Sequence, residues 1–256
     1  MTKMKSISTM LLAALFFAGC NNADKQTINT LTKKEKRDGW ELLFDGKTLN
    51  GWRGLGRDAV QPDHWKVENG MIRKVSNKEV PKQPDGKPVI GGDLMTVETF
   101  DDFELYFEWK IMPAGNSGIK YNVSEELSMA HGSKFSALGF EYQILDDGHE
   151  KYDGKLKPTQ YTGSLYDLFP PENVKLNPIG EFNSSRILFK GNYGEHWLNG
   201  EKVLEFNLDS PEFDAAFQKS KFVSYTGFAK KRKGHIVITD HSDDSWYRNI
   251  KIRKLK

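Results

Sequence analysis

The sequence of 256 residues contains one cysteine, Cys20, so the chain cannot form an internal disulfide. Its fold must therefore be stabilised by a hydrophobic core, even in an oxidising compartment. Acidic and basic residues nearly balance at a formal net charge of +2, and the composition carries no nucleic-acid signature. The one basic cluster, Lys230–Lys233, is typical of a solvated hairpin tip.

The N-terminus lacks an apolar run long enough to span a membrane as a helix. Its apolar run, Leu11–Phe17, follows Lys3 and Lys5 and precedes the small residues Ala18-Gly19. This pattern is typical of a secretory signal rather than of a spanning helix.

Residues 17–20 resemble the bacterial lipobox, in which signal cleavage leaves a cysteine at the new N-terminus and a lipid is attached to its sulfur. We therefore expect a signal peptide over residues 1–19, lipidation of Cys20 and export to a membrane. Asn21, where Asp would signal retention at the inner membrane, favours the outer membrane, on either its periplasmic or its surface face. Residues 20–38 are polar and predict a tether, which leaves residues 39–256 as one domain.

The domain shows no alternation of strands with long helices. In Phe103–Ile111 every odd position is apolar and the even positions are mostly polar, which is the period of a half-buried strand. Only Ser210 to about Ser220 predicts a helix, with a serine cap and a proline in the first turn. Many strands and one helix predict an all-β sandwich. The other expected strands are Trp40–Phe44, Trp65–Lys74, Gly118–Val123, Phe140–Leu145, Arg186–Lys190, Gly194–Leu198, Lys202–Phe206, His235–Asp240 and Trp246–Lys254.

The densest polar cluster lies on the strand Phe140–Leu145 and in the turn that follows it. Alternation directs Glu141 and Gln143 to one face, and Phe140, Tyr142 and Ile144 to the other. Two long polar side chains on a face bounded by aromatics are unusual for a solvent face. A plain exposed strand is the alternative, because most charged residues are merely solvated.

Four other segments place polar residues beside glycines or strand ends, where they can reach a ligand or simply satisfy a turn. They are Gly115–Gly118, Gly163–Asp167, Gly180–Asn183 and the pair Thr239–His241 with Tyr247–Asn249. His196 and Asn199 fit a strand and the tight Asn-Gly turn after it. His64 and His131 have no supporting neighbours, and we expect both on the surface.

These motifs together resemble the 3-keto-disaccharide hydrolase family, whose members are also described as 3-keto-glucoside 1,2-lyases and 3-keto-2-hydroxyglucal hydratases. The resemblance runs in order from about Gly39 to Leu255, although Phe182 stands where Trp is common and Thr239 where Gln is usual. Its motifs are Gly39–Trp52, Gly115–Ile119, Glu141–Asp146, Gly163–Asp167, Gly180–Asn183, Trp197–Gly200, Asp240-His241 and Arg248–Ile250.

The resemblance implies a concanavalin A-like jelly roll, with two curved antiparallel sheets and a concave sugar-binding face. It implies cleavage of 3-keto-glycosides by abstraction of the C2 proton, elimination of the C1 substituent and rehydration, which needs a base, an acid and a donor for the enolate oxygen. We expect Glu141 to be the base, and His149, Tyr166 and His241 are candidates to protonate the leaving group. The expected substrate-binding residues are Asn116, Gln143, Asp146, Glu181, Asn183 and Arg248.

Two other functions fit the same residues. Glucanases of this fold carry Glu-x-Asp-x-x-Glu on one strand, and Glu141-x-Gln143-x-x-Asp146 is a weakened form of that pattern for a two-carboxylate glycoside hydrolase. A non-catalytic carbohydrate-binding surface lipoprotein would need aromatics on the concave face but no base.

No organic cofactor is expected, whereas a divalent cation stays open. Asp146, Asp147, His149 and Asp153 lie close in sequence, as do Asp240, His241, Asp243 and Asp244, although neither spacing is diagnostic. The expected partners are a carbohydrate substrate, a membrane through the lipid anchor alone, and an upstream sugar 3-oxidoreductase that would supply the ketone.

Overall fold

The structure is a computed structural model that describes residues 27–131, 135–228 and 230–256. The predicted signal peptide and Cys20 lie outside the described residues. Among the helices of the described part, none is long and apolar enough to cross a membrane.

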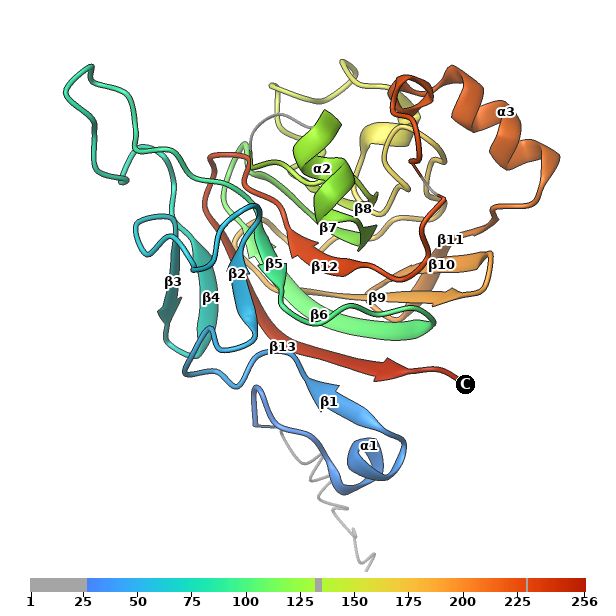
Figure 1. Cartoon of the computed structure of the whole chain (residues 1–256), viewed down its shortest axis with the longest axis horizontal. Helices are drawn as coiled ribbons and strands as arrows, with labels where there is room; N and C mark the ends of the chain where they lie inside the picture. The colour runs from blue at the N-terminus through green and yellow to red at the C-terminus, as the bar shows by residue number, and fades with distance from the viewer. Residues whose placement is uncertain (1–26, 132–134, 229) are drawn as a thin grey trace, which may run out of the picture.

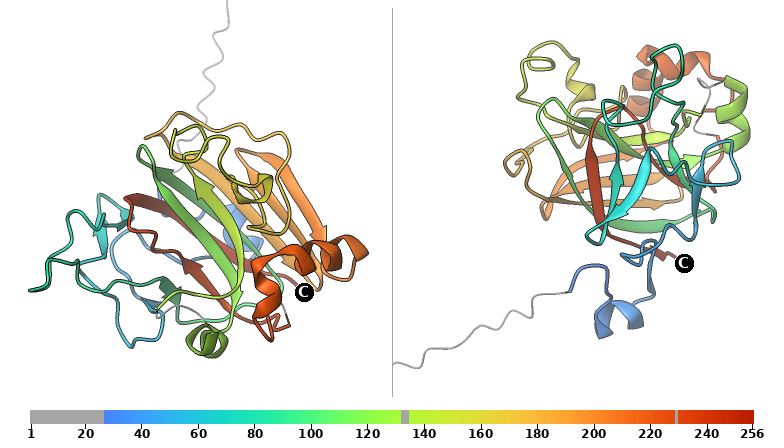
Figure 2. Two further views of the ribbon diagram at one scale, coloured as in Figure 1. Left: turned by 90° about the horizontal axis from the view of Figure 1, so that it is seen from above. Right: turned by 90° about the vertical axis from the view of Figure 1, so that its left-hand side faces the viewer.

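Two antiparallel sheets form the domain (Figure 1, Figure 2), which confirms the predicted all-β sandwich. One sheet has the order β11-β10-β9-β6-β13-β4-β3, with β1 paired to β13, and the other has the order β2-β5-β12-β7-β8. The strands of the larger sheet are β1 (Trp40–Leu42), β3 (Trp65–Glu68), β4 (Met71–Lys74), β6 (Phe103–Ile111), β9 (Asn183–Lys190), β10 (Tyr193–Leu198), β11 (Glu201–Asn207) and β13 (Ser245–Lys254). Those of the smaller sheet are β2 (Trp52–Gly54), β5 (Leu94–Thr96), β7 (Asn116–Val123), β8 (Phe140–Leu145) and β12 (His235–Ile238).

Short helices connect the strands. The predicted helix is α3 (Pro211–Lys219), and the Ser210 hydroxyl accepts the backbone N–H of Phe213 at 3.1 Å as its N-cap. The sequence did not predict α1 (Lys33–Arg37) or α2 (Glu125–His131). Two 3₁₀ turns, η1 (Pro158–Gln160) and η2 (Lys221–Ser224), complete the described helical elements. Figure 1 shows α2 beside β7 and β8 of the smaller sheet. Phe213 of α3 packs against the core residue Phe140 of β8, and Phe169 of the 146–182 loops packs against Phe206 of β11, so α3 and these loops also contact the core.

Aromatic side chains join the two sheets. On β6 the odd residues from Phe103 to Ile111 are buried, and on β8 the inward residues are Phe140, Tyr142 and Ile144, as alternation predicted. Phe107 meets Tyr142 edge-to-face at a centroid distance of 5.7 Å. Such a pair contributes about 0.5–1.5 kcal/mol beyond its buried area. The inner face of β8 is therefore fixed, which also fixes the side chains on its outer face.

The segment before β1 is attached to the larger sheet. Thr32 and Glu35 form a capping box at the start of α1, and Glu35 pairs with Lys251 of β13. Asn29 and Asn249 each donate a backbone N–H to the side-chain oxygen of the other. Residues 27–38, part of the expected tether, thus contact the domain.

Candidate active site

Polar side chains gather on the outer face of β7 and β8. Glu141 and Gln143 lie on this face, opposite the inward Tyr142, in agreement with the predicted alternation. Lys120 is the cross-strand neighbour of Glu141, and Gly118 is that of Gln143. Loops cover this face, so Glu141 is only 5% exposed and Gln143 only 3% exposed.

Glu141 lies between two basic side chains. Its Oε2 is 3.9 Å from Nζ of Lys120, and its Oε1 is 3.7 Å from Nε2 of His241. Burial acts to raise the pKa of Glu141, but the charges of Lys120, His241 and Lys221 outweigh it and hold the pKa below its usual value. Glu141 is therefore a carboxylate at neutral pH, which is the form that can accept a proton.

Lys120 is held as a cation. Burial acts to lower its pKa, but the charges of Glu141 and Asp93 raise the pKa above its ordinary value. Its ammonium also donates to the carbonyl of Ala137 at 2.9 Å.

Gly118 makes room for the Glu141 carboxylate. A Cβ at position 118 would lie 2.6 Å from Oε1 of Glu141 and 3.1 Å from the carbonyl oxygen of Tyr142. Any larger residue would displace the carboxylate, so the glycine and the glutamate depend on each other.

Four buried polar atoms in this region have no hydrogen-bond partner among the described residues: Oε1 of Glu141, Oε1 of Gln143, Oγ of Ser164 and Oγ1 of Thr239. The backbones that carry these atoms are hydrogen-bonded to one another. Thr239 donates its N–H to the carbonyl of Gly118 on β7, and Gln143 on β8 donates its N–H to the carbonyl of Ser164. Each unsatisfied polar group costs about 1–3 kcal/mol. Of the four residues, Glu141 lines the cleft described next.

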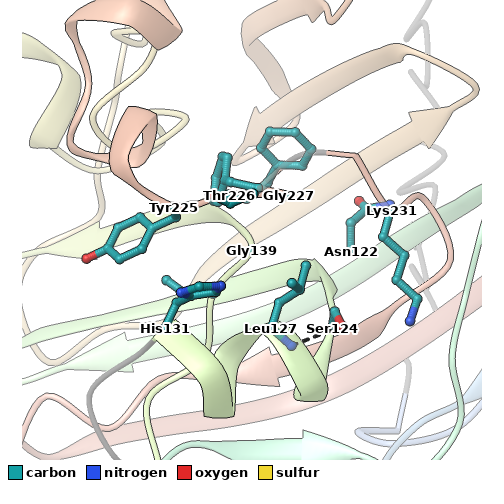
Figure 3. Close-up of a pocket in the computed structure, with 12 residues that line it drawn as sticks. Asn122, Ser124, Leu127, His131, Gly139, Tyr225, Thr226, Gly227 and Lys231 are labelled. Atoms are coloured by element: carbon teal, nitrogen blue, oxygen red, sulfur yellow. Dashed lines mark hydrogen bonds between the residues drawn. The ribbon is translucent and has the colours of Figure 1, made fainter.

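A cleft of about 160 Å³ opens beside Glu141. Its lining residues are Lys120, Ser136, Ala137, Leu138, Gly139, Glu141, Lys221, Phe222 and Tyr225. A small pocket adjoins it and shares Leu138, Gly139 and Tyr225; Figure 3 shows this pocket between α2 and the segment that carries Tyr225 to Phe228. The cleft therefore has a charged end at Glu141 and an apolar end beneath α2.

Tyr166 lies next to Glu141, and Asn116 lies next to Gln143. Tyr166 donates its N–H to the carbonyl of Glu141 at 3.0 Å, and its phenol accepts a hydrogen bond from Gln160 at 3.2 Å. Burial, and then the charge of Glu141, raise the pKa of the phenol, so it stays protonated. Asn116 accepts a hydrogen bond from the Gln143 amide at 3.2 Å.

Asp93 connects two segments that border the site, the one that contains Ala137 and the turn that contains Asp240. It is 2% exposed, and its carboxylate accepts the N–H of Asp240 at 2.8 Å and the N–H of Ala137 at 2.7 Å. Asp240 precedes His241, and its carboxylate lies 3.0 Å from Nζ of buried Lys74. This network fixes the turn that places His241 over Glu141.

The structure thus brings together five of the predicted site residues, namely Glu141, Gln143, Asn116, Tyr166 and His241. It does not bring the other five to this face. His149 forms hydrogen bonds within the turn 146–153, where its Nδ1 accepts the N–H of Lys151. The Asp146 carboxylate accepts the N–H of Ala114, and so it supports the turn before Asn116.

Three expected substrate-binding residues lie elsewhere in the sandwich. Asn183 is buried at the start of β9, where its oxygen accepts from Asn177 and Asn199, and Glu181 is exposed in the preceding loop. Arg248 lies on β13 of the larger sheet, 2.7 Å from Glu108, and its guanidinium stacks 3.8 Å from the Phe182 ring centre. Tyr247 points into the core, so Arg248 points away from it, and the structure does not place these three residues beside Glu141.

Sequence reasoning missed Lys120, Lys221 and Asp93. The position of Lys120 could have been predicted, because it lies between Ile119 and Tyr121 on a strand, and alternation places it on the face opposite to theirs. The positions of Lys221 and Asp93 could not, because they reach the site only through the packing of distant segments.

The surface placement of His64 was also wrong. His64 is 1% exposed, its Nε2 lies 2.9 Å from the carbonyl of Val89, and its Nδ1 lies 3.5 Å from Asp240. The segment through Val89 to Gly92 covers it, which the local sequence could not show. His131 is exposed, as predicted.

Within residues 27–131, 135–228 and 230–256, no three His, Cys, Asp or Glu residues are arranged to hold a metal ion. Two of the acidic residues suggested for this purpose have other partners. Asp147 accepts from Thr162, and Asp244 accepts from Arg73.

Comparisons with known proteins agree with this architecture. Residues 39–253 match the family model described as the 3-keto-alpha-glucoside-1,2-lyase-like domain. A 3-keto-disaccharide hydrolase of Bacteroides thetaiotaomicron is 36% identical over 238 residues, which cover 85% of this chain and 79% of that protein. Among solved structures, a candidate glycosyl hydrolase from Parabacteroides distasonis ATCC 8503 is 32% identical with a TM-score of 0.77, over 90% of this chain and 100% of that chain. Another from the same organism is 25% identical with a TM-score of 0.61, over 84% of this chain and 99% of that chain.

Proposed function

Because this chain belongs to the 3-keto-alpha-glucoside-1,2-lyase-like domain family, we propose that it cleaves 3-keto-glycosides by abstracting the C2 proton with Glu141. It is a glycoside-cleaving enzyme, and the relative named a 3-keto-disaccharide hydrolase supports 3-keto-disaccharides as its substrates. The proton-abstraction route is our inference from the site.

The ketone at C3 acidifies the proton at C2. The Glu141 carboxylate takes this proton, and the electron pair of the C–H bond delocalises onto the C3 oxygen as an enolate. The enolate then collapses to form the C1–C2 double bond and expel the C1 substituent, which leaves with a proton from an acid. Water adds back, with its oxygen on C1 and its proton on C2, so the net reaction is hydrolysis.

The residues around Glu141 fit these steps. Tyr166 and His241 are the candidate acids, since the raised pKa of Tyr166 keeps its phenol protonated and His241 lies next to the carboxylate. Gln143 and Asn116 are linked by a hydrogen bond and orient the sugar hydroxyls. A positioned base and acid each contribute about 10²–10⁴-fold to a rate.

The observation that carries the proposal is one ionised, buried carboxylate, Glu141, that lines a cleft together with Lys120 and Lys221. A classical glycoside hydrolase uses two carboxylates that flank the scissile bond. On β8 the second position is Gln143, which cannot ionise, while Asp146 accepts a backbone N–H at 2.9 Å. The site therefore supplies one carboxylate base rather than a pair of catalytic carboxylates.

The test is incubation of the protein with a 3-keto-glucoside and with the unoxidised glucoside, both in heavy water. We expect cleavage of the keto substrate alone, with deuterium at C2 of the 3-keto-sugar product. Cleavage of the unoxidised glucoside would indicate a two-carboxylate hydrolase, and binding without cleavage of either would indicate a carbohydrate-binding module. The dependence on a ketone implies that a sugar 3-oxidoreductase acts upstream.

A further inference from the structure

Lys221 is a basic residue of the cleft that the steps above leave without a role. It begins η2, and its backbone N–H donates to Oδ2 of Asp167 at 2.8 Å. Its ammonium lies 4.4 Å from the ring centre of Tyr166 and 5.2 Å from that of Phe222. Lys221 is an exposed residue that lines the same cleft as Glu141, so a substrate can reach it.

Lys221 differs from the two other basic side chains near Glu141 in its lack of a bonded partner. Lys120 donates to Ala137 and pairs with Glu141, and His241 also faces Glu141. For Lys221, no carboxylate of the described residues lies within 4.0 Å of the ammonium, and no hydrogen bond of the ammonium to them is present. A cation held over aromatic rings, close to a carboxylate but not paired with it, is available to a negative charge on a ligand.

We propose that the Lys221 ammonium donates a hydrogen bond to the C3 oxygen of the substrate and stabilises the negative charge that develops there. This inference rests on the proposed function. When Glu141 takes the C2 proton, the electron pair of that C–H bond moves toward the C3 oxygen, and Lys221 keeps its own proton throughout. C2 and C3 are adjacent atoms, so the base and the cation must lie in one cleft, as Glu141 and Lys221 do.

The electrostatics agree with this role. The protein packed around the ammonium lowers the pKa of Lys221, Lys120 lowers it further, and Glu141 opposes both. A less basic ammonium is a stronger hydrogen-bond donor to an enolate oxygen. The ammonium lies over the rings of Tyr166 and Phe222, which hold the charge at the cleft before the substrate arrives.

The experiment compares Lys221→Met, Lys221→Arg and the control Lys219→Met. Methionine keeps an apolar stem without the charge, arginine keeps the charge, and Lys219 is an exposed residue at the end of α3 outside the cleft lining. Loss of one oxyanion donor typically lowers turnover by about 10²–10³-fold. We expect such a loss of kcat for Lys221→Met, a much smaller one for Lys221→Arg, and a wild-type rate for Lys219→Met. KM should change less than kcat, because the charge develops only in the transition state.

Thermal melting of each variant shows whether it is folded, and the rate of C2 deuterium incorporation reports the proton-transfer step directly. A folded Lys221→Met variant within tenfold of the wild-type exchange rate would overturn the role of Lys221 and leave the proposed function intact. Trapping by borohydride of the keto substrate on Lys221 would also overturn it, because the amine would then be a nucleophile rather than a donor. Wild-type protein that cleaves without exchange at C2 would instead overturn the proposed function.

Discussion

Replacement of Glu141 by glutamine is the most informative single change. Glutamine keeps the shape of the side chain but cannot accept the C2 proton. Loss of a positioned general base lowers turnover by about 10²–10⁴-fold, which corresponds to roughly 3–5.5 kcal/mol of transition-state free energy at 1.36 kcal/mol per tenfold. Substrate binding should largely survive, because Gln143 and Asn116, the residues proposed to orient the sugar, are unchanged.

The same change also removes a charge that two basic side chains face. Removing one partner of a buried ion pair lowers the free energy of unfolding by about 3–5 kcal/mol. In Glu141→Gln the loss should be smaller, because Lys120 still donates to the carbonyl of Ala137 and still lies near Asp93. A matched control is Glu104→Gln. Glu104 is 4% exposed and accepts from Arg186 and Arg253 on the larger sheet, away from the cleft.

The assay is turnover of a 3-keto-glucoside well below the melting transitions, with deuterium at C2 of the product read by mass spectrometry or NMR. Glu104→Gln should lower the melting temperature and leave kcat near the wild-type value, whereas Glu141→Gln should lower kcat far more than stability. Substrate deuterated at C2 will react more slowly only if proton transfer limits the rate, so solvent exchange is the better observable. Turnover of Glu141→Gln within tenfold of wild type would refute the assignment of the base.

Further outcomes follow from the same geometry. Gln143→Ala should weaken turnover without abolishing it, because the residue orients the sugar; a loss as complete as that of the base variant would contradict this division of roles. Lys120→Met should raise the pKa of Glu141 toward its ordinary value. Because the carboxylate is the active form, the acidic limb of the plot of kcat/KM against pH should then move to higher pH. An acidic limb at the wild-type pH would show that Lys120 does not lower the pKa of Glu141. Gly118→Ala, whose Cβ would come 2.6 Å from the Glu141 carboxylate, should reduce kcat by more than tenfold with a smaller effect on melting, and a wild-type rate would count against the close fit. We also propose that Cys20 carries a lipid, so Cys20→Ser should move the protein from the membrane to the soluble fraction, and unchanged fractionation would exclude the anchor.

Alternation predicted the strands where one face is buried over several residues. β6 and β8 lie at the predicted bounds, because the period of two is clear over nine and six residues. β2 and β5 are three residues long, too short to show a period. The predicted strand Trp65–Lys74 is a hairpin of β3 and β4, since Asn69 and Gly70 both have positive φ at its turn. In α2 only Ser128 is buried, so its sequence shows no amphipathic pattern.

The site was predictable where it depends on one strand and not where it depends on pairing between strands. Glu141 and Gln143 follow from alternation on β8 alone. Lys120 faces Glu141 only through the register of β7 against β8, and the sequence does not specify that register. The position of Arg248 on the larger sheet was not predictable, because a motif gives the order of residues along the chain but not the sheet to which a strand belongs. The family and the all-β sandwich are confirmed, and the lyase route, the anchor and the residue roles stay predictions.

If Cys20 carries a lipid, the attachment of residues 27–38 to β13 has a consequence for the direction in which the cleft faces. Figure 1 shows α1 and β1 at one end of the molecule, and α2 and α3 toward the other. Only seven peptide steps separate Cys20 from Thr27, a reach of at most about 25 Å. A lipid on Cys20 would therefore hold the larger sheet near the bilayer and present the cleft to the aqueous side. Substrates would then arrive by diffusion from solution, and a neighbouring membrane protein would contact the back of the enzyme rather than its catalytic face.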